Sequence, residues 1–84
     1  MEPDLIKQLI EEKLSDCDIS VTGENGHFEV VAIGDVFTDK SMVAKQQLIY
    51  GTINEHISSG AIHALTIKTY TPAEWEKAQK LRVQ

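Results

Sequence analysis

Residues 17–33 read Cys-Asp-Ile-Ser-Val-Thr-Gly-Glu-Asn-Gly-His-Phe-Glu-Val-Val-Ala-Ile, and this stretch decides the fold. Apolar and polar side chains alternate over residues 17–22, which is the pattern of a half-buried strand. Residues 27–33 are predicted to form a second strand, and Asn25-Gly26 between the two is a strong hairpin signal. The stretch therefore predicts two antiparallel strands joined by a turn at residues 23–26.

Helices and a third strand are predicted around this hairpin. Apolar residues recur at helical spacing over residues 3–14, and Ser41 is the expected N-cap of a helix that runs to about residue 58. Residues 62–70 are predicted as a strand, and Thr71-Pro72-Ala73-Glu74 has the capping-box pattern of a last short helix. The order αββαβα predicts one α/β (α+β) domain over residues 1–84, a three-stranded mixed sheet with helices packed on one face.

One residue of the long predicted helix conflicts with the helical preference of its neighbours. Gly51 costs about 1 kcal/mol relative to alanine at such a position. Close packing of this helix on the sheet would explain why a residue without a side chain is found there.

Composition limits the possible functions. The formal net charge is −5, whereas binding to nucleic acid by bulk electrostatics needs the opposite sign. The single cysteine, Cys17, excludes an intramolecular disulfide and a CxxC zinc site. No apolar run approaches the roughly 18 residues of a membrane span, and Met1-Glu2-Pro3-Asp4 is acidic rather than signal-like. We therefore expect a cytoplasmic protein that does not bind membranes.

The predicted topology brings two histidines together. The hairpin strands are antiparallel, and the single helix between the second and third strands makes those two parallel. His27 begins the second strand and His63 lies at the beginning of the third, so both are expected at the same end of the sheet. Cys17 begins the first strand and is expected at the far end, roughly 15 Å away at about 3.3 Å per residue.

This histidine pair has two interpretations. Two imidazoles are too few for a closed structural zinc site, so they are either polar strand-end residues or a half-site completed by a partner. Histidine can replace cysteine on an iron of a [2Fe–2S] cluster, and its ligation is sensitive to pH because only neutral imidazole binds metal. The sequence shows no Ser-His-Asp or paired-carboxylate arrangement, and we do not expect an enzyme.

Several short segments, each weak alone, are specific in their order and spacing. They are His27-Phe28-Glu29-Val30, Phe37, Val43-Ala44-Lys45-Gln46-Gln47-Leu48-Ile49-Tyr50-Gly51, Ile62-His63-Ala64-Leu65 and Tyr70-Thr71-Pro72-Ala73-Glu74-Trp75. Together they resemble the BolA family, and within it the IbaG-like bacterial branch, from about residue 4 to residue 80. The resemblance implies a KH-like fold, which agrees with the predicted element order.

The resemblance also implies a cluster and a partner. Members of this family pair with a monothiol glutaredoxin, and a [2Fe–2S] cluster is held between the glutaredoxin cysteine, glutathione and the BolA-type protein. The cluster-binding histidine of the family maps onto His63. Many members carry a second cysteine or histidine in a longer loop between the first two strands. Here that loop is short and has neither, so His27 is the nearest candidate. The isolated chain is expected to hold no cluster tightly and to be a monomer or weak homodimer.

The alternative function is a nucleic-acid-binding regulator of the stress response. The family is linked to transcriptional regulation and to the response to acid. The DNA contacts would have to come from the cations that lie late in this chain, which are Lys68, Lys77, Lys80 and Arg82. The long helix, which has been likened to part of a helix-turn-helix, holds only Lys40 and Lys45 as cations. Any binding to DNA is therefore expected to be weak.

Overall fold

The predicted hairpin is present in the computed structural model, which describes residues 2–82. Strand β1 (Asp18–Glu24) pairs antiparallel with β2 (His27–Ile33), and only Asn25 and Gly26 connect them. Both connecting residues have positive φ, 55° and 83°, which is the conformation that a two-residue type I′ turn requires and that Asn-Gly favours. The strands thus extend further into the predicted turn than the sequence pattern indicated.

The sheet is mixed, with the strand order β1-β2-β3. Strand β3 (Ala64–Tyr70) runs parallel to β2, and the chain crosses between them through the 3₁₀ turn η1 (Asp35–Phe37) and helix α2 (Met42–Ser58). The parallel pair confirms the predicted topology. Because β3 begins at Ala64, His63 lies in the segment that leads into the strand rather than in the strand itself.

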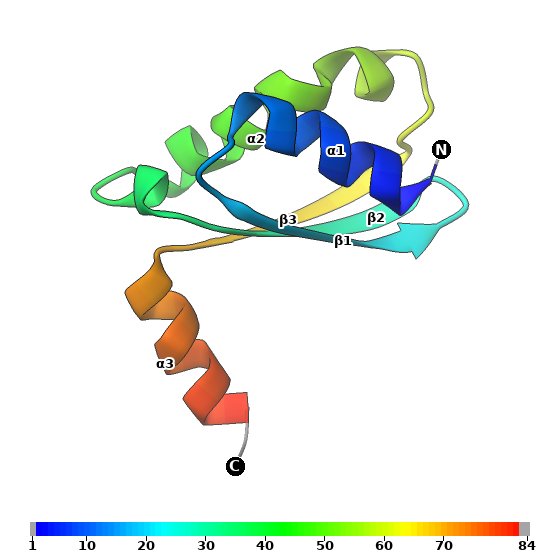
Figure 1. Cartoon of the computed structure of the whole chain (residues 1–84). Helices are drawn as coiled ribbons and strands as arrows, with labels where there is room; N and C mark the ends of the chain where they lie inside the picture. Colours follow the sequence, from blue (N-terminus) through cyan, green and yellow to red (C-terminus); the bar gives the residue numbers. More distant parts are fainter. Residues whose placement is uncertain (1, 83–84) are drawn as a thin grey trace.

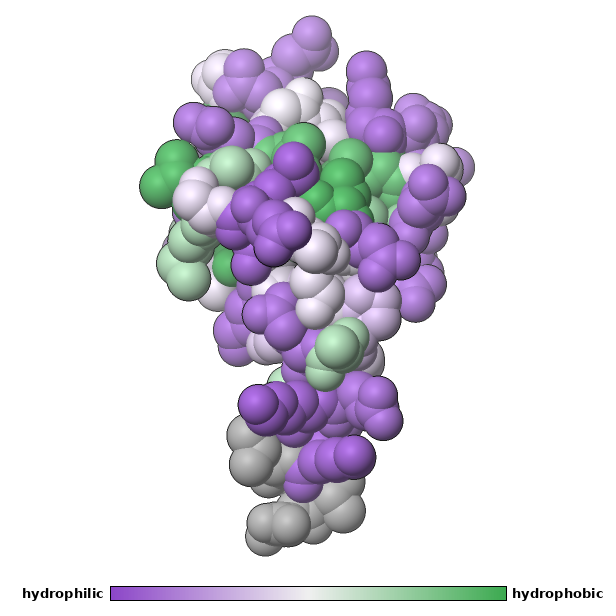
Figure 2. All heavy atoms as spheres, turned by 90° about the vertical axis from the view of Figure 1, so that its left-hand side faces the viewer, coloured by the Kyte–Doolittle hydropathy of each residue, from purple (hydrophilic) through white to green (hydrophobic). Residues whose placement is uncertain are grey.

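The helices do not all lie on one face of the sheet. Helices α1 (Pro3–Lys13) and α2 cover one face, as predicted, whereas α3 (Pro72–Arg82) projects from the opposite side (Figure 1). The expectation of one common face is wrong for α3, whose sequence has too few apolar residues to form the stripe by which a helix packs. Its surface in Figure 2 is mostly hydrophilic. Within residues 2–82, none of the helices has both the length and the apolarity to cross a membrane.

Helix α3 is held at its first turn. The predicted capping box is present, since the Thr71 N–H donates to Glu74 Oε1 at 2.8 Å and the Glu74 N–H donates to Thr71 Oγ1 at 3.2 Å. The backbone hydrogen bond from Thr71 lowers the pKa of the Glu74 carboxyl. Trp75 packs edge-on against Tyr70 with ring centroids 5.1 Å apart. These contacts join the helix to the end of β3.

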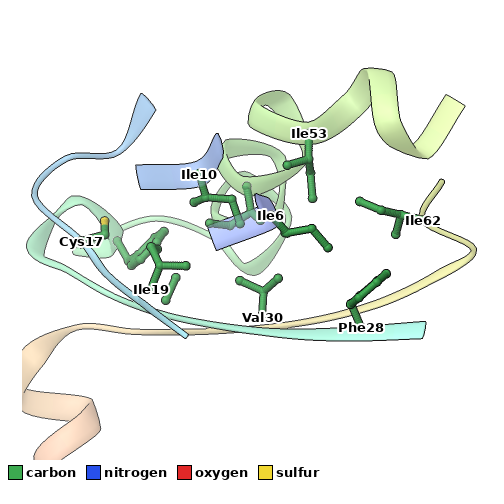
Figure 3. Packing of buried hydrophobic residues seen from close by; sticks show 11 residues of the cluster. Ile6, Ile10, Cys17, Ile19, Phe28, Val30, Ile53 and Ile62 are labelled. Atoms are coloured by element: carbon green, nitrogen blue, oxygen red, sulfur yellow. The ribbon is translucent and has the colours of Figure 1, made fainter. Parts of the chain in front are cut away.

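The core lies between the sheet and the layer formed by α1 and α2 (Figure 3). Its buried side chains are Ile6, Ile10, Cys17, Ile19, Phe28, Val30, Ala32, Phe37, Ile49, Ile53 and Ile62. In β2, burial alternates strictly, so Phe28 and Val30 face the helices while His27 and Glu29 face the other side. This alternation places His27 on the sheet face that α1 and α2 leave open.

Helix α2 is kinked at Ile53, where φ is −129° and ψ is 15°. The Thr52 hydroxyl donates to the Ile49 carbonyl oxygen at 2.6 Å. In a regular helix this carbonyl would accept the N–H of Ile53, so the Thr52 side chain competes with the backbone at this turn. A threonine hydroxyl bonded to the preceding turn is a recognised cause of helix bending.

Gly51 is exposed, and the expectation that close packing explains it is wrong. A Cβ atom at this position would meet no atom within 4 Å. We therefore expect Gly51→Ala to raise the free energy of unfolding by about 1 kcal/mol, because alanine has the higher helix propensity and the more restricted unfolded chain. Urea unfolding followed by circular dichroism measures this difference.

Gly60 provides the matched control for this substitution. A Cβ atom at Gly60 would also meet no atom within 4 Å, but its φ is +85°. Gly60→Ala should therefore lower the free energy of unfolding by about 1–2 kcal/mol, because alanine is strained in the left-handed region. If Gly51→Ala also destabilised the protein, the kinked segment of α2 would require glycine for a reason other than packing.

Candidate functional site

His27 and His63 lie at the same end of the sheet, as predicted. His27 is the first residue of β2, and its Cα partner in β3 is Ala64, the residue that follows His63. Both histidines are exposed. The structure shows no hydrogen bond from either imidazole to another residue in the range 2–82. Both rings are therefore free to bind a group that approaches this end of the molecule.

The turn before β2 fixes the position of His63. The carbonyl oxygen of Gly26 accepts two hydrogen bonds, from the His63 N–H at 2.7 Å and from the Ala64 N–H at 3.0 Å. The imidazole of His63 also lies against Gly26, because a Cβ atom built on that glycine would overlap His63 Cδ2 and lie 3.0 Å from Cγ. The ring of His63 is thus held beside the residue that immediately precedes His27.

His27 and His63 alone would be an incomplete set of metal ligands. No three His, Cys, Asp or Glu side chains of the described residues are grouped so that they could hold a metal ion. Any nitrogen ligand that this chain gave to a metal at this end of the sheet would come from His27, His63 or both, and the remaining ligands would have to come from another molecule.

A shallow depression of about 260 Å³ adjoins His27 on the open side of the sheet. It is lined by Thr22, Gly23, His27, Phe28, Glu29, Ala64 and Thr66. The lining residues come from all three strands, at the strand ends that lie nearest the histidines. A molecule that contacts His27 can therefore approach without displacing a helix.

Cys17 lies at the opposite end of the sheet. It precedes Asp18, which pairs with Ile33, and Ile33 is about 20 Å along β2 from His27 at about 3.3 Å per residue. The thiol is buried, and a Cβ atom on Gly34 would lie 2.7 Å from its Sγ. Burial raises the pKa of the Cys17 thiol, and the neighbouring carboxylates of Asp16 and Asp18 raise it further. Because ligation and nucleophilic attack need the thiolate, Cys17 is a core residue rather than part of the site.

The cations considered for nucleic-acid binding lie on two different elements. Lys68 is in β3 and forms an ion pair with Glu29, with an Nζ–Oε1 distance of 3.6 Å. Lys77 and Lys80 are in α3, where Lys80 pairs with Glu76 at 3.8 Å. Arg82 ends α3, and its side chain lies outside the described part of the structure. Exposed pairs such as these are weak, but they place a carboxylate beside two of the cations.

Sequence reasoning missed the contact between Gly26 and the His63 ring. The Asn-Gly pair indicated a turn, and it explained the glycine by backbone conformation alone. The contact depends on the parallel register of β2 with β3, which places His63 one residue before the partner of His27. No local sequence pattern predicts the register between β2 and β3.

Comparisons with known proteins identify relatives of this chain in sequence and in fold. A family model described as BolA-like protein matches residues 7–74. The acid stress protein IbaG of Escherichia coli K12 is 43% identical over 81 residues, which cover 96% of each chain. The DNA-binding transcriptional regulator BolA of the same organism is 40% identical over 57 residues, 68% of this chain and 53% of that protein. A bolA protein homologue from Coxiella burnetii has a similar structure, with a TM-score of 0.80, 38% identity, and coverage of 90% of this chain and 97% of that one.

Proposed function

This chain belongs to the BolA-like protein family, and from that premise we propose that it is a non-enzymatic adaptor that shares a [2Fe–2S] cluster with a monothiol glutaredoxin. His63 supplies a nitrogen ligand, His27 is the second candidate, and the glutaredoxin cysteine and glutathione supply sulfur. The cluster is cargo held between the proteins. The observation that carries the proposal is the pair of exposed imidazoles at one end of the sheet, beside the β1–β2 turn.

The chemistry of these side chains suits such a cluster. A [2Fe–2S] cluster has four terminal ligands, and histidine replaces cysteine on one iron in Rieske-type centres. His27 and His63 offer at most two nitrogen ligands. A glutaredoxin cysteine and the thiol of glutathione would provide the sulfur ligands that this end of the molecule lacks.

His63 is the better placed of the two histidines. Its backbone N–H is bonded to Gly26 and its ring lies against the same residue, so little freedom remains to be lost when the ring binds. His27 lies on the open face of the sheet beside the shallow depression. We therefore assign the main ligand to His63 and a supporting position to His27.

A mixing experiment tests this function. Adding the protein to a [2Fe–2S] monothiol glutaredoxin in the presence of glutathione should change the visible absorption and circular dichroism of the cluster, because imidazole replaces a sulfur ligand. The change should saturate as the protein is added. Apo-glutaredoxin serves as the control and should give no visible signal. An unchanged cluster spectrum, in a mixture that gel filtration shows to contain the complex, would contradict the proposal.

No observation favours the nucleic-acid alternative over this function. Lys68 and Lys80 each have a carboxylate partner, and the formal charge of the chain is −5. One relative is named a DNA-binding regulator, and that description applies to the relative. Weak DNA binding by this chain stays a prediction from the sequence.

A further inference from the structure

We infer that Gly26 is a positioning residue for the cluster ligand, because the space left by its missing side chain is the place where the His63 imidazole is held. The inference rests on the proposed function of His63. It goes beyond that function by assigning a role in ligand geometry to a residue that has no ligand atom of its own.

The contact between the two residues is steric. A Cβ atom built on Gly26 would overlap His63 Cδ2, and it would lie 3.0 Å from Cγ and 3.3 Å from the Cβ of the histidine. The nearest atoms are therefore successive atoms of one side chain, and they include the root of that side chain as well as its ring. A side chain at position 26 could not be accommodated by a small shift of the ring tip, and the whole imidazole would have to move.

The backbone carbonyl of Gly26 also holds the start of β3, through hydrogen bonds. The carbonyl oxygen accepts the N–H of His63 at 2.7 Å and that of Ala64 at 3.0 Å. Since Ala64 is the β3 partner of His27, these bonds connect the turn, the start of β2 and the start of β3. Gly26 thus fixes where the His63 backbone lies, and its open side fixes where the ring lies.

A side chain at position 26 therefore meets two separate obstacles. The φ of +83° is strained for any L-residue, and the His63 ring occupies the space that the side chain needs. Only the second obstacle depends on His63. Removing the His63 ring should relieve the overlap and leave the backbone strain unchanged, so the two obstacles can be separated by experiment.

A double-mutant cycle in urea unfolding makes this separation without any cluster. Gly26→Ala should lower the unfolding midpoint of the wild-type protein clearly more than it lowers the midpoint of the His63→Ala protein. Asn25→Ala is the matched control, because it strains the same turn, where φ is 55°, and adds no atom. Its shift should be equal in the two backgrounds. Equal shifts for Gly26→Ala in both backgrounds would overturn the inference.

The cluster spectrum tests whether Gly26 positions the His63 ring, because an effect of Gly26 on stability alone would leave the spectrum of the folded protein unchanged. If wild-type protein shares a cluster with glutaredoxin, folded Gly26→Ala protein should reproduce the spectral loss of His63→Ala, while Asn25→Ala should retain the wild-type spectrum. A wild-type spectrum from Gly26→Ala would overturn the positioning role. If the wild-type protein itself produced no shared cluster, the proposed function would fail while the unfolding cycle still decided whether Gly26 positions His63.

A measurement on the unmodified protein covers the case in which Gly26→Ala does not fold. The nuclear Overhauser effect between the Hα protons of Gly26 and the Hδ2 proton of His63 should be strong in the wild-type protein, because the Cδ2 edge of the ring faces this glycine. Absence of that cross-peak, with both resonances assigned, would overturn the inference.

Discussion

Replacing His63 with alanine is expected to abolish the change in the cluster spectrum that the wild-type protein produces with a [2Fe–2S] glutaredoxin. The ring of His63 is held against Gly26, exposed, and free of hydrogen bonds to other described residues. Loss of a residue that only supports a metal ligand costs about 10–100-fold in metal affinity, so loss of the ligand should cost at least about 100-fold. Titration by visible circular dichroism measures the loss.

His56→Ala is the matched control for this substitution. His56 is half-buried in the last turn of α2. Its backbone carbonyl accepts hydrogen bonds from the Ile62 N–H and from the Ser59 hydroxyl, and alanine retains both. His56→Ala should therefore leave the cluster spectrum unchanged. His27→Ala should give a smaller change than His63→Ala. A wild-type spectrum from folded His63→Ala protein would remove His63 from the proposed site.

Replacing Phe37 with alanine is expected to remove a large fraction of the free energy of unfolding. Phe37 is fully buried in η1, between the end of β2 and the start of α2. Truncation of a buried phenylalanine to alanine lowers the free energy of unfolding by about 3–5 kcal/mol, and a domain of this size has a total of about 4–13 kcal/mol. The variant should unfold at a much lower urea concentration, as measured by far-ultraviolet circular dichroism.

Val36 provides a control for the location of Phe37 in this turn. Val36 belongs to the same 3₁₀ turn, but 38% of its surface is exposed. Val36→Ala should lower the free energy of unfolding by less than about 1 kcal/mol, because surface substitutions remove little packing. Similar losses for Val36→Ala and Phe37→Ala would show that the turn itself, and not the buried ring, accounts for the stability.

The hairpin and the parallel pair could be predicted because each depends on short-range signals. Asn25-Gly26 sets the antiparallel turn, and one helix between β2 and β3 sets their parallel direction. These two facts are sufficient to place His27 and His63 at one end of the sheet and Cys17 at the other. The topology is therefore sufficient to predict at which end of the sheet the candidate site lies.

Other features could not be predicted because they depend on tertiary packing. Helix α3 has few apolar residues, so its sequence does not indicate which side of the sheet it occupies. Gly51 suggested a close approach of α2 to the sheet, but it lies on the exposed side of the helix. The contact of Gly26 with His63 follows from the β2–β3 register, which joins residues that are far apart in the sequence.

The histidine pair can be interpreted as polar strand-end residues or as a half-site, and the two interpretations differ only in what another molecule brings to it. A polar strand end and a half-site present the same two exposed imidazoles. The difference is whether a partner brings iron and sulfur to them. The expectation of such a partner came from the resemblance to the BolA family, and spacing or periodicity could not have indicated it.

Pulsed electron paramagnetic resonance on the reduced shared cluster would identify its nitrogen ligand. The protein would carry ¹⁵N-labelled histidine and would be mixed with unlabelled [2Fe–2S] glutaredoxin and glutathione. We expect a strong ¹⁵N hyperfine coupling from a directly bound imidazole in the wild-type protein, and its loss in His63→Ala. A cluster in the wild-type complex without any ¹⁵N coupling would show that no histidine of this chain binds it, and would contradict the proposed function.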